Sequence, residues 1–187
     1  MIELFRLAAE LQDICRRQQW PFCFIGGIAV QRWGEPRVTQ DVDMTILTGF
    51  GDESSYIDHL LGKFAARVSD AAEFALRNRV LLLQSASGIG IDISLGGLPF
   101  EQLVVERASP FEFLPNIALV TCSAEDLVVL KSFADRPRDW VDVENVIARQ
   151  SSVLDWAYIE RSLSPLVEVK ESPEILVRLR HLRSAIG

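Results

Sequence analysis

Two aspartates, Asp41 and Asp43, are the residues of this sequence most suited to carry chemistry. They alternate with apolar residues in segment 41–46, DVDMTI, which predicts a β-strand. Because successive strand side chains point to opposite faces, the two carboxylates share one face, roughly 6.6 Å apart along the strand. Neighbouring acids repel each other, and desolvating them without a partner is costly. A cation held between them best explains this pattern.

Two glycines, Gly26 and Gly27, precede this strand at the end of a short apolar run, residues 22–25. Glycine lets the backbone turn tightly and approach a ligand closely. The helix predicted over residues 28–33 would also present the unpaired N–H groups of its start to an anion. One short segment therefore offers a phosphate site and a divalent-metal site, which together indicate handling of a nucleoside triphosphate with Mg²⁺.

The order of these features resembles the signature of the polymerase-β-like nucleotidyltransferase superfamily. The matching residues are Gly26-Gly27, an intervening helix and turn, and then Arg37-x-Thr39-x-Asp41-x-Asp43. Within the superfamily, the chain most resembles abortive-infection-type (AbiEii-like) toxins and minimal bacterial nucleotidyltransferases. The resemblance covers about residues 20–150. It implies an α/β (α+β) fold in which helices flank a mixed sheet, followed by a small C-terminal helical region.

This family has a third carboxylate on a later strand, and Asp92 matches its place. Two apolar runs, 79–84 and 89–95, flank small residues and predict a β-hairpin. In the second run, Gly90 and Asp92 share the face opposite to the isoleucines. Gly90 would leave space for a ligand beside the carboxylate. The alternative for Asp92 is an isolated strand aspartate that caps a loop.

A second resemblance to the AbiEii-type members lies in segment 127–147, where a Lys-x-x-Ala motif precedes Arg-Asp-x-x-Asp. The matching residues are Lys131, Ala134, Arg138, Asp139 and Asp142. The resemblance implies that Lys131 could neutralise phosphate charge, although a lysine at the core edge with its charge in solvent fits equally well. Asp139 and Asp142 are expected to be structural, as partners of Arg136 and Arg138 or as helix caps.

The reaction that the resemblance implies is transfer of a nucleoside monophosphate from an NTP to an acceptor hydroxyl, with release of pyrophosphate. Asp41 and Asp43 would hold two Mg²⁺ (or Mn²⁺) ions about 3.5–4 Å apart. Asp92 would complete the metal site and act as general base. Gly26 and Gly27 would seat the β- and γ-phosphates.

The acceptor is left open by the sequence: an RNA end, a protein side chain or a small hydroxylated molecule would each fit. A toxin of this kind also implies an antitoxin protein as partner. The alternative from another class is a non-catalytic nucleotide-binding protein or toxin–antitoxin partner that keeps the fold. The three intact acids, Asp41, Asp43 and Asp92, argue against this alternative.

The other elements that must position these residues are predicted from apolar periodicity and from the residues that typically begin or end helices and strands. Arg37 and Thr39 precede the acidic strand, and both could contact triphosphate. The alternative is that Arg37 forms only a salt bridge and that Thr39 is an ordinary strand residue with a hydroxyl. We expect a nucleotidyltransferase-like domain over 1–150 and a helical appendage over 151–187. Helices are predicted over 2–18, 56–68 and 99–107, and twice after 150 with a break at Ser164-Pro165. A further helix is predicted from 124 to near 137, because residues 123–126 match a capping-box pattern that begins with Ser123. A second hairpin is predicted over 111–120.

The composition bounds the class of protein. With 187 residues, 49% of them hydrophobic, and a net charge of −7, the chain is globular. This charge argues against a protein that coats nucleic acid through phosphate contacts. No apolar run is long enough to span a membrane, and we expect a cytoplasmic protein without a disulfide framework, because Cys15, Cys23 and Cys122 are widely spaced.

Overall fold

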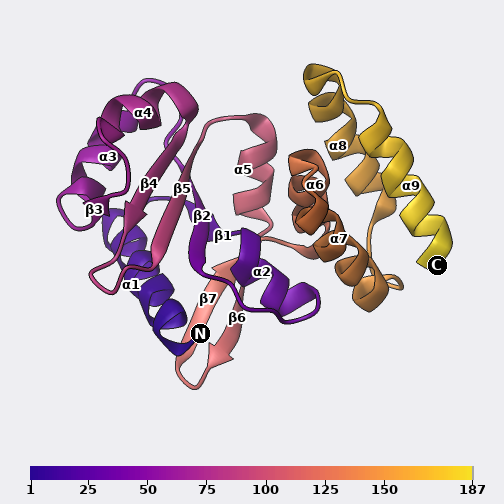
Figure 1. The fold of residues 1–187 in the computed structure, drawn as a ribbon, viewed down its shortest axis with the longest axis horizontal. Helices are drawn as coiled ribbons and strands as arrows, with labels where there is room; N and C mark the ends of the chain where they lie inside the picture. The colour runs from indigo at the N-terminus through magenta and orange to yellow at the C-terminus, as the bar shows by residue number, and fades with distance from the viewer. Residues whose placement is uncertain (187) are drawn as a thin grey trace. The chain divides into compact units, whose positions relative to one another are not determined.

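The computed structural model describes residues 1–186. Within this range, seven strands form one mixed sheet in the order β3-β4-β5-β2-β1-β7-β6 (Figure 1). The sheet and its flanking helices confirm the α/β fold class expected from the sequence. The strands are β1 Phe22–Phe24, β2 Asp41–Leu47, β3 Ala65–Ala66, β4 Val80–Gln84, β5 Gly90–Gly96, β6 Ser109–Leu114 and β7 Ile117–Thr121.

Strand β2 lies in the middle of the sheet and organises it. It pairs antiparallel with β1 and parallel with β5. The two predicted hairpins are confirmed, because β4 pairs antiparallel with β5 and β6 with β7. Strand β1 also pairs in parallel with β7. The parallel neighbour of the acidic strand β2 is β5, which comes from a distant part of the chain.

The alternation of β2 separates a core face from a polar face. Val42, Met44 and Ile46 are fully buried. They belong to the same core cluster as the apolar residues of helix α1 (Ile2–Gln18), such as Leu7. Helix α1 therefore covers the apolar face of the sheet, and its predicted bounds are confirmed. Asp41 and Asp43 lie on the opposite face.

Three more helices belong to the same part of the chain: α3 Glu53–Leu61, α4 Ala71–Asn78 and α5 Pro99–Glu106. The helix predicted over 56–68 is wrong in its second half. Helix α3 ends before Gly62, and residues 65–66 form β3, which pairs with β4. Phe64 is buried in the core. The apolar periodicity continued past Leu61 because the following segment also contributes to the core, although it is not helical.

The C-terminal part of the chain is helical: α6 Ala124–Ala134, α7 Pro137–Gln150, α8 Trp156–Lys170 and α9 Glu174–Ile186. The predicted cap of α6 is confirmed, since Ser123 Oγ accepts a 3.1 Å hydrogen bond from the Asp126 N–H. The predicted break at Ser164-Pro165 is wrong, because α8 continues through Pro165. Buried Leu163 and Val167, on either side of the proline, hold this turn against its neighbours.

The chain forms two compact units. The sheet unit comprises residues 1–28 and 38–122, and the helical unit comprises residues 29–37 and those from 123 onwards. Helix α2 (Gly26–Trp33) begins in the first and ends in the second. The domain boundary at residue 150 that we expect from the sequence remains a prediction. The last residue of the expected second domain, 187, lies outside the described range. Within residues 1–186, every helix is too short or too polar to cross a membrane.

Candidate active site

Three predicted site residues lie on one face of two neighbouring strands. Asp43 on β2 is directly opposite Asp92 on β5, and Asp41 is opposite Gly90. Residues paired across strands project to the same face of the sheet. The register therefore places the side chains of Asp41, Asp43 and Asp92 on a common surface, here called the carboxylate face.

The carboxylate face is partly open to solvent. The side chains of Asp41 and Asp92 are 48% and 34% exposed. Partial burial raises the pKa of Asp92, and the nearby charge of Asp41 raises it further, while the guanidinium of Arg67 opposes both effects. The site thus holds its negative charges close together and only partly hydrated, which favours binding of a cation.

Arg67 is a residue of this face that the sequence reading missed. Its guanidinium donates a hydrogen bond to Asp92 Oδ1, and its Nη1 lies 4.0 Å from Asp41 Oδ1. The sequence placed this position in a helix, whereas it directly follows the two-residue strand β3. A strand of two residues carries too little alternation to be recognised from sequence alone.

The two glycines form the first turn of α2, so the helix begins at Gly26 instead of residue 28. A Cβ on Gly26 would overlap the carboxylate of Asp43, and a Cβ on Gly27 would overlap Thr39. The Gly27 N–H donates to Asp43 Oδ2 over 3.3 Å. The missing side chains of Gly26 and Gly27 therefore make room for the side chains of Asp43 and Thr39. The role of the two glycines in phosphate binding stays a prediction.

The donor set of the carboxylate face suits a hard divalent cation such as Mg²⁺, which prefers carboxylate oxygens. In the conformation described for residues 1–186, however, no group of three or more His, Cys, Asp or Glu side chains is arranged to hold a metal ion. Arg67 and the Gly27 amide already engage carboxylates of the face. Asp41, Asp43 and Asp92 thus fit a metal by type and strand position, and they would have to exchange partners to bind it.

Lys131 lies in the helical unit and is almost fully buried. Its Nζ is 2.6 Å from Asp139 Oδ1 and 2.9 Å from Asp142 Oδ2. Arg136 also pairs with Asp139, and Arg37 donates two 2.7 Å hydrogen bonds to Asp142. Asp139 and Asp142 are therefore buried members of an ion-pair network, and the predicted phosphate role of Lys131 stays untested.

The pKa values of these two acids report how well the network is paired. Burial by itself would raise the pKa of Asp142, but the hydrogen bonds from Arg37 and Lys131 outweigh it and lower the pKa below its ordinary value. The same balance holds for the pKa of Asp139, with Arg136 and Lys131 as donors. Both carboxylates are thus held as ions inside the helical unit.

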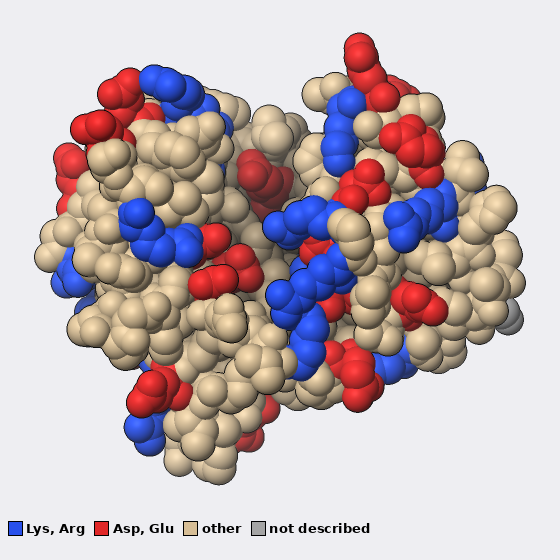
Figure 2. Space-filling view, in the orientation of Figure 1, with Lys and Arg blue, Asp and Glu red and all other residues tan. Residues whose placement is uncertain are grey.

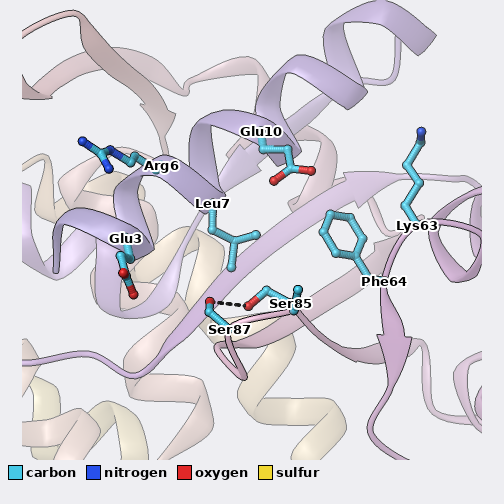
Figure 3. Close-up of a pocket in the computed structure, with 9 residues that line it drawn as sticks. Glu3, Arg6, Leu7, Glu10, Lys63, Phe64, Ser85 and Ser87 are labelled. Carbon is cyan, nitrogen blue, oxygen red and sulfur yellow. Dashed lines mark hydrogen bonds between the residues drawn. The ribbon is translucent and has the colours of Figure 1, made fainter.

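A surface pocket of about 410 Å³ opens elsewhere in the sheet unit (Figure 3). Its floor is apolar, formed by Leu7 and Phe64, and charged side chains of α1 rim it together with Lys63. The turn between β4 and β5 closes one side, where Ser85 and Ser87 hydroxyls lie 3.0 Å apart. None of the predicted site residues lines this pocket, so it lies apart from the carboxylate face.

On the face shown in Figure 2, the surface charges do not form one large field of a single sign. Figure 2 shows basic and acidic side chains intermingled on the viewed face of each unit. Two basic residues of α9, Arg180 and Arg183, both pair with Glu160 on α8. This distribution agrees with the acidic net charge and gives no broad phosphate-binding surface on this face.

Comparisons with known proteins bear on the family and the fold of the chain. The family model described as "Nucleotidyl transferase AbiEii toxin, Type IV TA system" matches residues 16–168, which is most of the chain. No curated protein shows significant similarity. An antigenic nucleotidyltransferase-like protein from Paracoccidioides brasiliensis has the same fold, at 15% sequence identity and a TM-score of 0.56, with 96% of this chain and 93% of that chain covered.

Two further solved structures are more distant. The lincosamide antibiotic adenylyltransferase LnuA, with lincomycin bound, is 15% identical with a TM-score of 0.47, covering 73% of this chain and 92% of its own. ANT(2'')-Ia in complex with adenylyl-2''-tobramycin is 15% identical with a TM-score of 0.43, covering 100% and 97%.

Proposed function

Because the chain belongs to the family of AbiEii nucleotidyltransferase toxins, we propose that it transfers a nucleoside monophosphate from an NTP to an acceptor hydroxyl in a Mg²⁺-dependent reaction. The observation that carries this proposal is the register of β2 and β5, which pairs Asp43 with Asp92 and leaves Asp41 on the same face. We propose the cytoplasm as the place of the reaction.

Asp41, Asp43 and Asp92 are the proposed ligands of Mg²⁺ or Mn²⁺. When bound, the cation neutralises triphosphate charge and lowers the pKa of the attacking hydroxyl. In the transfer, the acceptor oxygen forms a bond to the α-phosphorus while the bond to the bridging oxygen breaks, and pyrophosphate leaves. Asp92 takes the proton of the acceptor hydroxyl as general base.

The backbone N–H groups of Gly26 and Gly27, at the start of α2, are the proposed contacts of the β- and γ-phosphates. A helix start presents unpaired donors and a partial positive charge, which favour an anion. The Gly27 N–H donates to Asp43 in this structure, so it becomes available only when Asp43 turns to a cation. The proposed role of Lys131 as a phosphate ligand similarly requires it to give up Asp139 or Asp142.

The acceptor is the part of the proposal that needs a direct assay. The protein is incubated with each NTP labelled at the α-phosphate, with Mg²⁺ or Mn²⁺, and with separate RNA, protein and small-molecule fractions of a cell extract. We expect label in one fraction and an equal release of pyrophosphate. Asp43→Asn should abolish both, while Asp13→Asn, an exposed change on α1, should leave them unchanged.

Two outcomes would overturn the catalytic proposal. Equal labelling by the wild type and Asp43→Asn would assign the activity to a contaminant. Calorimetric NTP binding without pyrophosphate release in any fraction would favour a non-catalytic nucleotide-binding protein.

The name of the family also supports a role as the toxin of a toxin–antitoxin pair. We propose that expression of the chain alone slows growth, that Asp43→Asn relieves this effect, and that an antitoxin protein counteracts it. Growth curves of cells expressing the wild type, Asp43→Asn or Asp13→Asn test this directly. Equal growth of all three cultures at equal protein levels would argue against toxicity.

A further inference from the structure

Arg67 lies in a straight row of residues that crosses the sheet to the carboxylate face. Its N–H donates a 3.0 Å hydrogen bond to the Leu82 carbonyl, which continues the pairing of β3 with β4 by one residue. Leu82 is opposite Asp92, and Asp92 is opposite Asp43. Residues in one such row share a face. The Arg67 side chain therefore reaches over Leu82, about two strand spacings of 4.8 Å, to Asp92.

The guanidinium ends between two of the proposed metal ligands. It donates to Asp92 Oδ1, and its Nη1 is 4.0 Å from Asp41 Oδ1. The space for this arrangement comes from Gly90, which lies between them on β5. A Cβ at residue 90 would overlap Asp41 Oδ1 and lie 3.0 Å from Arg67 Nη1. Gly90 is thus open on the side where the guanidinium and both carboxylates meet.

This contact is placed to be exchangeable. The side chains of Arg67, Asp92 and Asp41 are 29%, 34% and 48% exposed, so water reaches all three. Ion pairs that are open to solvent contribute little to stability. An arginine also brings only one positive charge. Its guanidinium cannot gather several oxygen ligands around one centre, as a divalent cation does. The arginine can therefore neutralise the carboxylates and still give way to a cation.

We propose that Arg67 is an internal counter-ion of the metal site, which occupies the place of a divalent cation and must withdraw from Asp41 and Asp92 before the cation binds. This inference rests on the proposed function, because it assigns a metal to the carboxylate face. It makes Arg67 a positioning residue. Its consequence is that the arginine lowers the affinity of the free protein for metal.

The test measures Mn²⁺ binding by the purified protein without nucleotide, from the loss of the free Mn²⁺ signal in electron paramagnetic resonance. We expect Arg67→Met to bind Mn²⁺ roughly 1.5- to fivefold more tightly than the wild type, which is the range that corresponds to one solvent-accessible ion pair. The matched control is Arg77→Met, since Arg77 pairs with Glu73 on the exposed surface of α4. This control should leave the affinity unchanged.

The proposal and the function on which it rests fail in different ways. If Asp43→Asn loses Mn²⁺ binding but Arg67→Met binds like the wild type, the counter-ion role is overturned and the metal site stands. If neither the wild type nor Arg67→Met binds Mn²⁺, both are overturned. A merely structural Arg67 would lower the melting temperature of Arg67→Met in EDTA without moving the Mn²⁺ titration. Arg67→Gln replaces Arg67→Met if the latter does not fold, with the same tighter binding expected.

Discussion

Asp43 and Asp92 lie directly opposite each other on the parallel strands β2 and β5. Their separation along the chain does not predict this pairing, because parallel strands are joined by a long crossover connection. Here the connection contains α3, β3, α4 and β4. The crossover also delivers Arg67 to the same face. The pairing of β2 with β5 therefore brings the acids together, and the pairings of β3 with β4 and of β4 with β5 bring Arg67 to them.

Gly26→Ala should damage the site more than the backbone strain alone explains. Gly26 has a positive φ of 53°, and a Cβ there would overlap the carboxylate of Asp43. The left-handed conformation costs a non-glycine residue about 1–2 kcal/mol. We expect a larger loss of unfolding free energy than this, together with loss of transfer activity. Urea denaturation and the labelling assay measure the two effects.

Gly88→Ala is the control that separates strain from overlap. Gly88 also has a positive φ, 81°, but a Cβ there would meet open space. This variant should lose only the strain and keep its activity. If Gly26→Ala and Gly88→Ala lose the same stability and both remain active, the proposed overlap with Asp43 is absent.

Gly90→Ala should disturb the carboxylate face without any backbone strain. A Cβ at this buried strand position would overlap Asp41 Oδ1. The Asp41 side chain is 48% exposed and can rotate away, so we expect little loss of unfolding free energy, while displacement of Asp41 should weaken Mn²⁺ binding. Gly62→Ala, at the exposed end of α3 with ordinary contacts, is the control for thermal melts and Mn²⁺ titration. Unchanged Mn²⁺ binding by Gly90→Ala would exclude Asp41 as a ligand.

Asp142→Asn should destabilise the helical unit in a pH-dependent way. The carboxylate is 1% exposed and pairs with Arg37 and Lys131, and breaking a buried ion pair costs about 3–5 kcal/mol. The folded pKa of Asp142 is lowered. Its contribution is therefore complete above the ordinary pKa, near 3.9, and is lost as pH falls through the folded pKa.

The difference in unfolding free energy between the wild type and Asp142→Asn should accordingly be largest near neutral pH and shrink below about pH 4. Urea titrations at several pH values measure it. Glu144→Gln, an exposed change on the same helix, should show no such difference. A gap between wild type and Asp142→Asn that persists unchanged to low pH would contradict the ion-pair explanation.

Tyr158→Phe should weaken the contact between α6 and α8. The Tyr158 hydroxyl donates a 2.5 Å hydrogen bond to Asp126 Oδ1, and Asp126 is fully buried. Removing the donor leaves a buried carboxylate oxygen less satisfied, which costs about 1–3 kcal/mol. Tyr56→Phe, whose ring packs on Trp20 in the sheet unit, is the matched control. Equal melting temperatures for the two variants would show that the Tyr158 hydrogen bond contributes nothing.

Local patterns predicted the elements whose cause is local. Alternation identified β2 and β5 and the faces of Asp43 and Asp92, because strand geometry fixes which residues share a side. Ser123 predicted the start of α6 because capping depends on neighbouring residues. The helix break predicted at Pro165 is wrong, since packing on both sides of the proline outweighs the hydrogen bond that it removes. Arg67 was missed because its strand is too short to show a pattern.

The sequence by itself determined that two aspartates share one face of a strand and that a third lies on the polar face of another. It could not determine that these strands are neighbours, or that their register pairs Asp43 with Asp92. It also left Lys131 open, and only the folded helical unit pairs it with Asp139 and Asp142. Side-chain alternation is set residue by residue, whereas strand pairing and buried ion pairs are chosen by the packing of the whole chain.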